Sequence, residues 1–413
     1  MMQAVSFPGG SPFHPGIADP GRDAGAVPAT ADVAVVGAGV IGLSIAWRLA
    51  RRGLSVVVFE RGTAGGGASL AATGMLAAAA EHEPGGHDLL ALALASQRQW
   101  PQFCADLEAQ SGRTIDFRSD ATLVVALGRD EVERLRFRHH LHQTCGLPTR
   151  WLGAAEVRAL EPALRPVAAG LHCAEDHQVD PRLVMAALRT ACRAAGVRLF
   201  ERCAVTAIDT RAGTACGVVT GRGACRAGAV VVAAGAWTGG VAPAGLKVPV
   251  RPLKGQSLAL RTTADTGTLA TIVWTEQIHM APKSDGRLIV GATVEEHGFD
   301  ETITAGGVYA LLEGARRAFP AIEEMAIDAV FTGLRPSSID DAPILGAAPG
   351  GVVLATGHHR NGYLLAPVTA FAVDELIARG SLPAVARPFD FCRFAGAEAA
   401  RTEPTLENTG LPS

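Results

Sequence analysis

The chain has 413 residues, 48% of them hydrophobic and 19% charged, and is therefore long enough to build more than one hydrophobic core. A net charge of −3 and a pI of about 6.5 argue against nucleic acid or an acidic membrane surface as a partner. The eight cysteines include no CxxC pair, no apolar run reaches the roughly 18–20 residues of a membrane span, and residues 1–30 lack a secretory signal pattern. These features predict a cytoplasmic protein with reduced thiols.

The two ends of the chain have the composition of unfolded segments. Residues 1–30 are rich in Gly, Pro and Ala, and residues 395–413 are mostly small and polar. Such segments bury too little apolar surface to offset the entropy of ordering them. We expect a disordered N-terminal extension over 1–30 and a flexible tail over 395–413.

The first expected elements form a strand, a helix and a second strand over residues 32–60. The strand DVAVVG leads into the glycine pattern GAGVIG, and SVVVFE follows as the second strand. Between them Ile41, Ile45 and Leu49 recur every four residues and give the helix one apolar face. This arrangement is typical of a dinucleotide-binding unit.

Each glycine of this pattern has a physical role. Gly37 allows the tight turn, Gly39 lets a pyrophosphate approach the backbone, and Gly42 lets the helix pack closely on the strand. The start of the helix offers free N–H groups and a positive dipole end to the phosphates. Glu60 follows Gly42 by 18 residues and can accept hydrogen bonds from ribose hydroxyls. The acid argues against NADP, but it does not separate NAD from FAD.

The segment after Glu60 favours FAD. Residues 61–77, RGTAGGGASLAATGMLA, are almost all small. Such a backbone can run flat against a large ring system with its amide groups facing the ring. A flexible loop is the alternative, but alanine is a poor residue for flexibility.

Later segments predict how the rest of the chain is built. Asp180 and Pro181 suit the N-cap and the first position of a helix. Apolar runs at 227–238 and 350–362 end at glycine, as core strands do at a ligand edge. Shorter β-like runs occupy 117–127, 247–262 and 271–294.

Together these elements predict an α/β protein. Its FAD-binding domain is Rossmann-like, of the glutathione-reductase type, and a mostly antiparallel substrate-binding domain is inserted into it. The expected FAD-binding parts are 31–95, 165–245 and 330–394, and the expected substrate-binding parts are 96–164 and 246–329.

Several motifs resemble those of the D-amino-acid oxidase superfamily, and most of all its glycine-oxidase branch, which serves thiamine biosynthesis. They are GASLAATGML, VVVAAGAWT, PLKGQSLAL, GRLIVGATVEEHGFD, GLRPSSIDDAPILG and GHHRNGYLLAPVTA, in the family's order over roughly residues 31–380. The resemblance implies non-covalent FAD, oxidation of a small amino acid or amine to an imine, and O2 as the acceptor.

The resemblance also assigns residues to the cofactor and the substrate. It places at FAD the residues Gly37, Gly39, Val40, Ile41, Gly42, Glu60, Arg61, Ala68, Ser69, Thr73, Gly74, Met75, Val205, His358, His359, Arg360, Asn361, Gly362, Tyr363 and Leu364. It assigns the substrate carboxylate to Arg335 and Arg360. His279 aligns with a family tyrosine that helps to hold this carboxylate, and it can do so if protonated or through one N–H. No side-chain base is expected, since the cofactor carries the redox chemistry.

Competing interpretations exist for the charged residues. Arg335 could instead form an ion pair with Asp340 or Asp341, and Arg360 could be an ordinary surface residue. For the adjacent His358 and His359 a role in the turn and at the flavin edge is favoured over catalysis.

The remaining histidines do not predict a metal site. His139 and His142 lie three apart on a charged helix, which favours a solvated face. No other set of residues has the spacing of metal ligands, so no metal is expected.

The expected reaction is oxidative deamination of glycine or another small amine, with O2 reduced to H2O2. One alternative is a dehydrogenase that passes electrons to a quinone or a partner protein. Another is a flavin-binding subunit of a larger complex. Relatives of this family often form oligomers, and the resemblance therefore implies a possible homo-oligomer.

Overall fold

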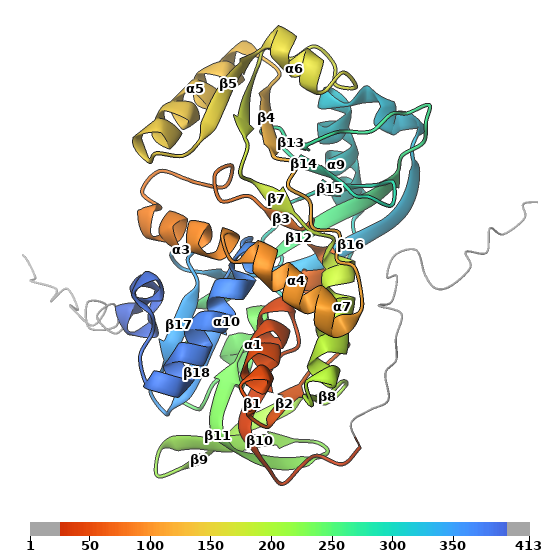
Figure 1. The fold of residues 1–413 in the computed structure, drawn as a ribbon. Coiled ribbons are helices and arrows are strands. Elements are labelled where there is room, and N and C mark those ends of the chain that lie inside the picture. The colour runs from red at the N-terminus through yellow and green to blue at the C-terminus, as the bar shows by residue number, and fades with distance from the viewer. Residues whose placement is uncertain (1–24, 395–413) are drawn as a thin grey trace, which may run out of the picture.

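Two large β-sheets, each with helices packed on it, organise the chain in the computed structural model, which describes residues 25–394 (Figure 1). Each large sheet has eight strands, and a small third sheet has two. The expected tail at 395–413 and all but the last six residues of the expected extension lie outside the described residues. Within 25–394 no helix has the length and apolar character that a membrane crossing requires.

The first sheet is built on the glycine-rich unit. Its central strands are parallel, and buried Val, Ile and Leu side chains fill both of its faces, as expected for a sheet covered on both sides. In spatial order its strands are β17 (Ile344–Ala347), β18 (Val352–Thr356), β11 (Gly223–Val232), β1 (Thr30–Val36), β2 (Val56–Phe59) and β8 (Arg198–Phe200). In addition, β10 (Thr214–Thr220) pairs with β11, and β9 (Val205–Arg211) pairs with β10.

Helices cover one face of this sheet, as Figure 1 shows in its lower half. They are α1 (Val40–Arg51), α7 (Pro181–Ala194), α10 (Gly362–Arg379), α3 (His87–Gln97) and α4 (Trp100–Ser111). The predicted start of α7 is confirmed, because the Asp180 carboxylate accepts a hydrogen bond from the Arg182 amide at 2.8 Å and Pro181 is the first helical residue. The apolar face of α1 packs into the core between sheet and helices.

The second sheet is antiparallel except where β13 pairs with β4. Its strands, in spatial order, are β16 (Ala326–Ser338), β12 (Val250–Arg261), β15 (Arg287–Gly291), β14 (His279–Pro282), β13 (Ile272–Trp274), β4 (Thr122–Ala126), β6 (Ala169–Cys173) and β5 (Thr149–Gly153). The helices α5 (Arg129–Thr144), α6 (Ala154–Leu160) and α9 (Ala305–Ala318) pack on it. The expectation of a solvated histidine face on α5 is wrong for His142, which is fully buried.

The two sheets meet beside β12 and β16, which pair with each other along their whole length. The small sheet of β3 (Met75–Leu76) and β7 (His177–Gln178) and the helix α2 (Ala68–Ala71) lie there, and α2 packs on β16. The remaining elements are α8 (Thr238–Val241) and four 3-10 turns, η1 (Gly235–Trp237), η2 (Pro320–Glu324), η3 (Ala384–Phe389) and η4 (Phe391–Phe394).

The division into an FAD-binding and a substrate-binding domain stays a prediction, and some of its boundaries do not follow the sheets. The expected FAD-binding parts include β6 and most of β16, yet both strands pair within the second sheet. The expected substrate-binding part includes α4, which packs against α7 on the first sheet. A strand's own sequence does not reveal which sheet completes its hydrogen bonds.

Candidate active site

A cavity of about 1460 Å³ lies between the two sheets, where the carboxyl ends of β1, β2 and β18 face β12, β14 and β16. Pockets for drug-sized ligands usually measure about 300–1,000 Å³, so this one can hold a dinucleotide together with a small second molecule. Ligands of open α/β sheets bind at this edge of the parallel strands.

The glycine turn forms one end of the cavity with almost no room for side chains. Gly37 has a φ of +103°, and a Cβ there would lie 2.4 Å from the Ala233 carbonyl oxygen. A Cβ on Gly42 would lie 2.0 Å from the Gly37 carbonyl oxygen, which explains why the helix can pack so closely. A Cβ on Gly39 would meet only the Ser69 hydroxyl, at 3.2 Å. Gly39 therefore borders open space, as a residue beside a pyrophosphate would.

Glu60 lies beside this turn, at the end of β2. Its two carboxylate oxygens accept hydrogen bonds from the amides of Ala38 (2.9 Å) and Gly62 (2.8 Å), which fix the side chain against the cavity. Next to it the guanidinium of Arg61 lies 3.5 Å from the ring centre of Trp237, a cavity residue. Nothing in the sequence pattern had pointed to Trp237 itself.

The small-residue segment lies flat in the wall of the cavity. A Cβ on Gly333 of β16 would come within 2.8 Å of the Ala68 Cα, so only small residues fit at this junction. The Tyr363 hydroxyl donates to the Ser69 carbonyl at 2.8 Å and holds the segment from the side of α10. Gly74 has a φ of +83°, and a Cβ there would meet the Val179 carbonyl oxygen at 2.1 Å.

A buried lysine that no motif had indicated supports the same segment. The Lys283 ammonium donates to the carbonyls of Thr73 and Val179 and to the Gln178 side chain, each at 2.8 Å. Burial lowers the pKa of Lys283 to about 8, while nearby acidic groups oppose this shift. Lys283 is therefore a structural clamp behind the cavity wall, found only through the tertiary structure.

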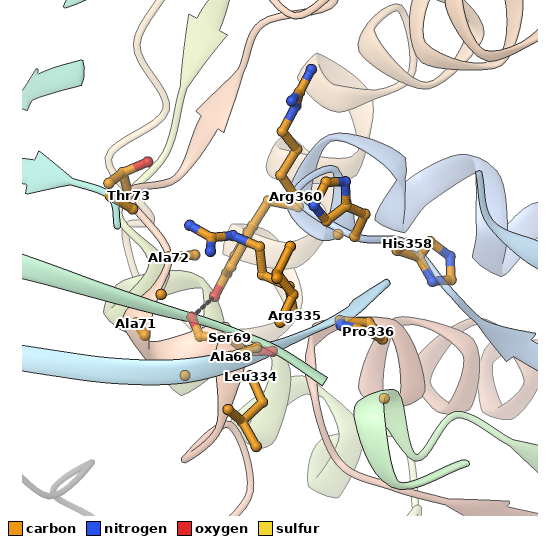
Figure 2. A pocket seen from close by; sticks show the side chains of 18 of the residues that line it. Ala68, Ser69, Ala71, Ala72, Thr73, Leu334, Arg335, Pro336, His358 and Arg360 are labelled. Carbon is orange, nitrogen blue, oxygen red and sulfur yellow. Dashed lines mark hydrogen bonds between the residues drawn. The ribbon is translucent and has the colours of Figure 1, made fainter. Parts of the chain in front are cut away.

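Arg335 extends from β16 into the cavity, and its guanidinium points toward Ala72 and Thr73 (Figure 2). It donates to two carbonyls, of Thr293 at 3.0 Å and of Lys254 at 3.4 Å. Among the ion pairs of residues 25–394 none includes Arg335. Asp340 pairs with Arg393, and Asp341 lies 3.8 Å from His359. The expected alternative of an Asp340 or Asp341 partner is therefore wrong.

Arg360 also lines the cavity, but its charge is already balanced. Its guanidinium binds Glu81 at 2.8 Å and Glu83 at 3.5 Å, and in Figure 2 it points away from Arg335. Burial raises the pKa of Glu81, while the neighbouring Arg360 opposes this rise. Sequence reasoning missed Glu81, whose partner lies 279 residues away.

His279 lies on β14 with its Nε2 atom 2.9 Å from the Thr73 hydroxyl. Burial, followed by the charges of Arg335 and Arg360, lowers its pKa to about 3. His279 is therefore neutral at pH 7 in this structure, which leaves hydrogen bonding rather than charge as its means of binding a carboxylate.

The turn after β18 separates its two histidines. The Nε2 atom of His358 lies 3.0 Å from the Thr369 hydroxyl, and burial lowers its pKa to about 3. His359 has a φ of +46°, and its Nδ1 atom lies 3.8 Å from Asp341. Both line the cavity edge, and neither has the partner set of a general base.

Most residues that the sequence had assigned to the cofactor, and all three assigned to the substrate, line this cavity. Gly42, Asn361 and Leu364 do not. Gly42 acts through helix packing, the Asn361 side-chain oxygen is buried without a partner, and Leu364 packs in the core.

A parallel sheet with a glycine-rich turn, an acid after its second strand and a large cavity facing a second sheet defines a dinucleotide-dependent oxidoreductase. The small-residue segment and the size of the cavity favour a flavin.

A family model described as "FAD dependent oxidoreductase" matches residues 32–376, and the chain belongs to this family, DAO. The expected FAD cofactor, the α/β fold class and the enzyme class are thereby confirmed.

Characterised relatives match most of the chain. Glycine oxidase of Geobacillus kaustophilus is 36% identical over 372 residues, which cover 88% of this chain and 97% of the relative. The bifunctional protein ThiO/ThiG of Synechocystis is 35% identical over 88% of this chain and 54% of its own length. The crystal structure of the Geobacillus glycine oxidase superposes with a TM-score of 0.84 at 35% identity, covering 89% of this chain and 99% of that chain. The resemblance stated from the motifs is confirmed.

Proposed function

We propose that this chain oxidises glycine or another small amino acid to an imine and uses O2 as the acceptor. The observation that carries the proposal is the guanidinium of Arg335, which lies in the cavity with two carbonyl contacts and, among residues 25–394, no ion pair with an acid. A partly buried cation without a counter-ion is unfavourable, and a substrate carboxylate would supply the missing charge. Because Glu81 and Glu83 already pair with Arg360, Arg335 is the arginine of β16 and the β18 turn that is left to bind a carboxylate.

The residues present fit the dinucleotide that the family requires. A Cβ on Gly37 or Gly42 would fill the turn, whereas Gly39 and the start of α1 border open space for a pyrophosphate. Glu60 would receive the ribose hydroxyls, and the segment from Ala68 to Met75 would lie along the flavin. When bound, FAD supplies the acceptor for the two electrons that leave the amine.

The protein's contribution to the reaction is positioning. Arg335 would clamp the carboxylate by two parallel hydrogen bonds, which fixes the direction of the α-carbon. His279 and the Thr73 hydroxyl, 2.9 Å apart, form a neutral hydrogen-bonding pair beside it. The neutral amine needs no side-chain base to lose its hydride. The imine then takes up water and releases ammonia and an oxo acid, and with glycine the imine is the species that thiazole synthesis for thiamine consumes.

Replacement of Arg335 by Met tests the proposal. We expect FAD to stay bound and kcat/KM for glycine to fall by about 10- to 100-fold, since hydrogen bonds to charged groups contribute roughly 1.5–3 kcal/mol. Arg261→Met is the matched control, because Arg261 is a half-exposed arginine of the same strand pair, on β12, and pairs with Asp328. An unchanged kcat/KM in Arg335→Met, with the control also unchanged, would remove the carboxylate role.

The acceptor and the assembly need separate experiments. Rapid reoxidation of the reduced flavin in air-saturated buffer is the expected result for an oxidase, and slow reoxidation would indicate a dehydrogenase that uses a quinone or a partner. Bleaching of the flavin by glycine in the isolated chain is expected. Its absence with every small amino acid tried would favour a flavin-binding subunit. Light scattering of the purified chain gives the state of any homo-oligomer.

A further inference from the structure

A cluster of nitrogen and sulfur donors lies at the rim of the cavity, outside the site described above. It consists of His82 in the turn before α3, His87 at the start of α3, and Cys145 at the end of α5. The Cys145 sulfur lies 3.5 Å from the His82 Nε2 atom and 4.0 Å from the His87 Nδ1 atom. All three ligand atoms lie within 4.8 Å of one another.

These distances are close to those of a tetrahedral zinc site. Bonds of about 2.0–2.1 Å to nitrogen and 2.3 Å to sulfur place neighbouring ligand atoms roughly 3.3–3.6 Å apart. The pair of His82 and Cys145 already meets this spacing. His87 is exposed at a helix start and lies 4.0 Å from the Cys145 sulfur, so its side chain would move inward on binding zinc. Imidazole and thiolate are the donors that zinc prefers in proteins.

A second observation points to the same place. His142 lies on α5 one helical turn before Cys145, and its ring centre is 6.3 Å from that of His82. His142 is fully buried, and neither of its ring nitrogens has a hydrogen-bond partner in the part of the chain that the structure describes. Buried polar atoms without partners are rare and call for a ligand or an ion nearby. His142 lies outside the group of three donors within 4.8 Å of one another, so its ring would turn toward them to supply the fourth bond.

The charges around the cluster tolerate a cation. The nearest basic side chain, Arg138, donates to the Ala80 carbonyl at 2.8 Å and lies 3.7 Å from Glu83, so its charge is partly balanced. Glu83, the acid that lies near both Arg138 and Arg360, is exposed beside the cluster.

We propose that His82, His87 and Cys145, with His142 as the fourth donor, bind one zinc ion at the rim of the cavity. The ion would tie the turn before α3 to the end of α5. Glu81, the partner of Arg360, directly precedes His82, so zinc would hold this part of the cavity wall in place. The site is independent of the redox chemistry proposed above.

Titration of the metal-free holoenzyme with ZnCl2 in a calorimeter tests the proposal. We expect one zinc per chain, and we expect Cys145→Ser and His87→Ala each to weaken binding by about 100-fold or more, since even outer partners of a metal contribute 10- to 100-fold. Both positions are at least partly exposed, so the variants should fold, and flavin content and melting temperature check this. Cys392→Ser and His140→Ala change an exposed cysteine and an exposed histidine outside the cluster, and they should bind zinc as the parent does.

Two further readouts do not depend on activity. X-ray absorption of the zinc-loaded chain should show sulfur and nitrogen neighbours, and zinc should slow amide exchange over residues 81–90. Absence of zinc binding, or full affinity in both Cys145→Ser and His87→Ala, would overturn the site.

Discussion

Gly255 offers a way to move the Arg335 guanidinium without removing its charge. Gly255 lies on β12 opposite Gly333 of β16, in ordinary extended backbone. A Cβ at this position would lie 2.3 Å from Nη1, 2.6 Å from Cζ and 2.7 Å from Nη2 of Arg335. The clash involves only the end of a flexible side chain, so Gly255→Ala should fold and bind FAD while the guanidinium shifts.

The size of the effect follows from these distances. Non-bonded heavy atoms are in contact at about 3.5–4.0 Å, so the guanidinium must move by roughly 1 Å. A misplacement of that size in a positioning group costs about 100-fold in rate, which corresponds to about 2.7 kcal/mol. We therefore expect kcat/KM for glycine to fall about 100-fold.

Anaerobic stopped-flow measurement of flavin reduction by glycine, in the parent and in Gly255→Ala, gives the change in the second-order rate constant directly. Binding of glycolate, which has the carboxylate but not the amine, should weaken in parallel. Gly306→Ala is the matched control, because a Cβ there meets nothing within 4 Å and alanine is the better helix residue. Unchanged reduction kinetics in Gly255→Ala would refute the argument that the position of Arg335 controls turnover.

Three other predictions test the cofactor and the buried polar groups. Gly39→Val should fold but purify with little flavin, because its side chain would fill the space for the pyrophosphate; a fully yellow protein would contradict the assignment. Tyr363→Phe removes the hydroxyl that donates to the Ser69 and Pro181 carbonyls, and it should lower the free energy of unfolding by about 1–3 kcal/mol in urea titrations. The pKa of His279 is about 3 in the folded protein and 6.5 ordinarily. Below pH 6.5 only the unfolded state therefore takes up this proton, and the free energy of unfolding decreases as the pH is lowered. Between pH 7 and 5.5 the parent should therefore lose about 1 kcal/mol more stability than His279→Phe, and equal losses would show that the histidine is not held neutral.

The cofactor-binding half of the site could be predicted from the sequence because its signals are local. The turn at Gly37, the packing of α1 through Gly42 and the acid at the end of β2 all lie within 24 residues, where backbone sterics dictate each residue type. The helix start at Asp180 is local in the same way, since one side chain caps the amide two residues on. Short-range geometry of this kind can be predicted directly from the order of the residues.

Only the tertiary structure decided which charges are paired and which donors meet. Arg335 and Arg360 are both arginines in glycine-containing motifs of the sequence, yet Glu81, 279 residues away, pairs with Arg360, and no acid among residues 25–394 pairs with Arg335. Cys145 approaches His82 across 63 residues, and Lys283 reaches Thr73 across 210. Strand pairing and helix packing bring these side chains together. The energy of an ion pair or of a buried donor depends on the distance between its atoms, and this distance cannot be read from the spacing of residues along the chain.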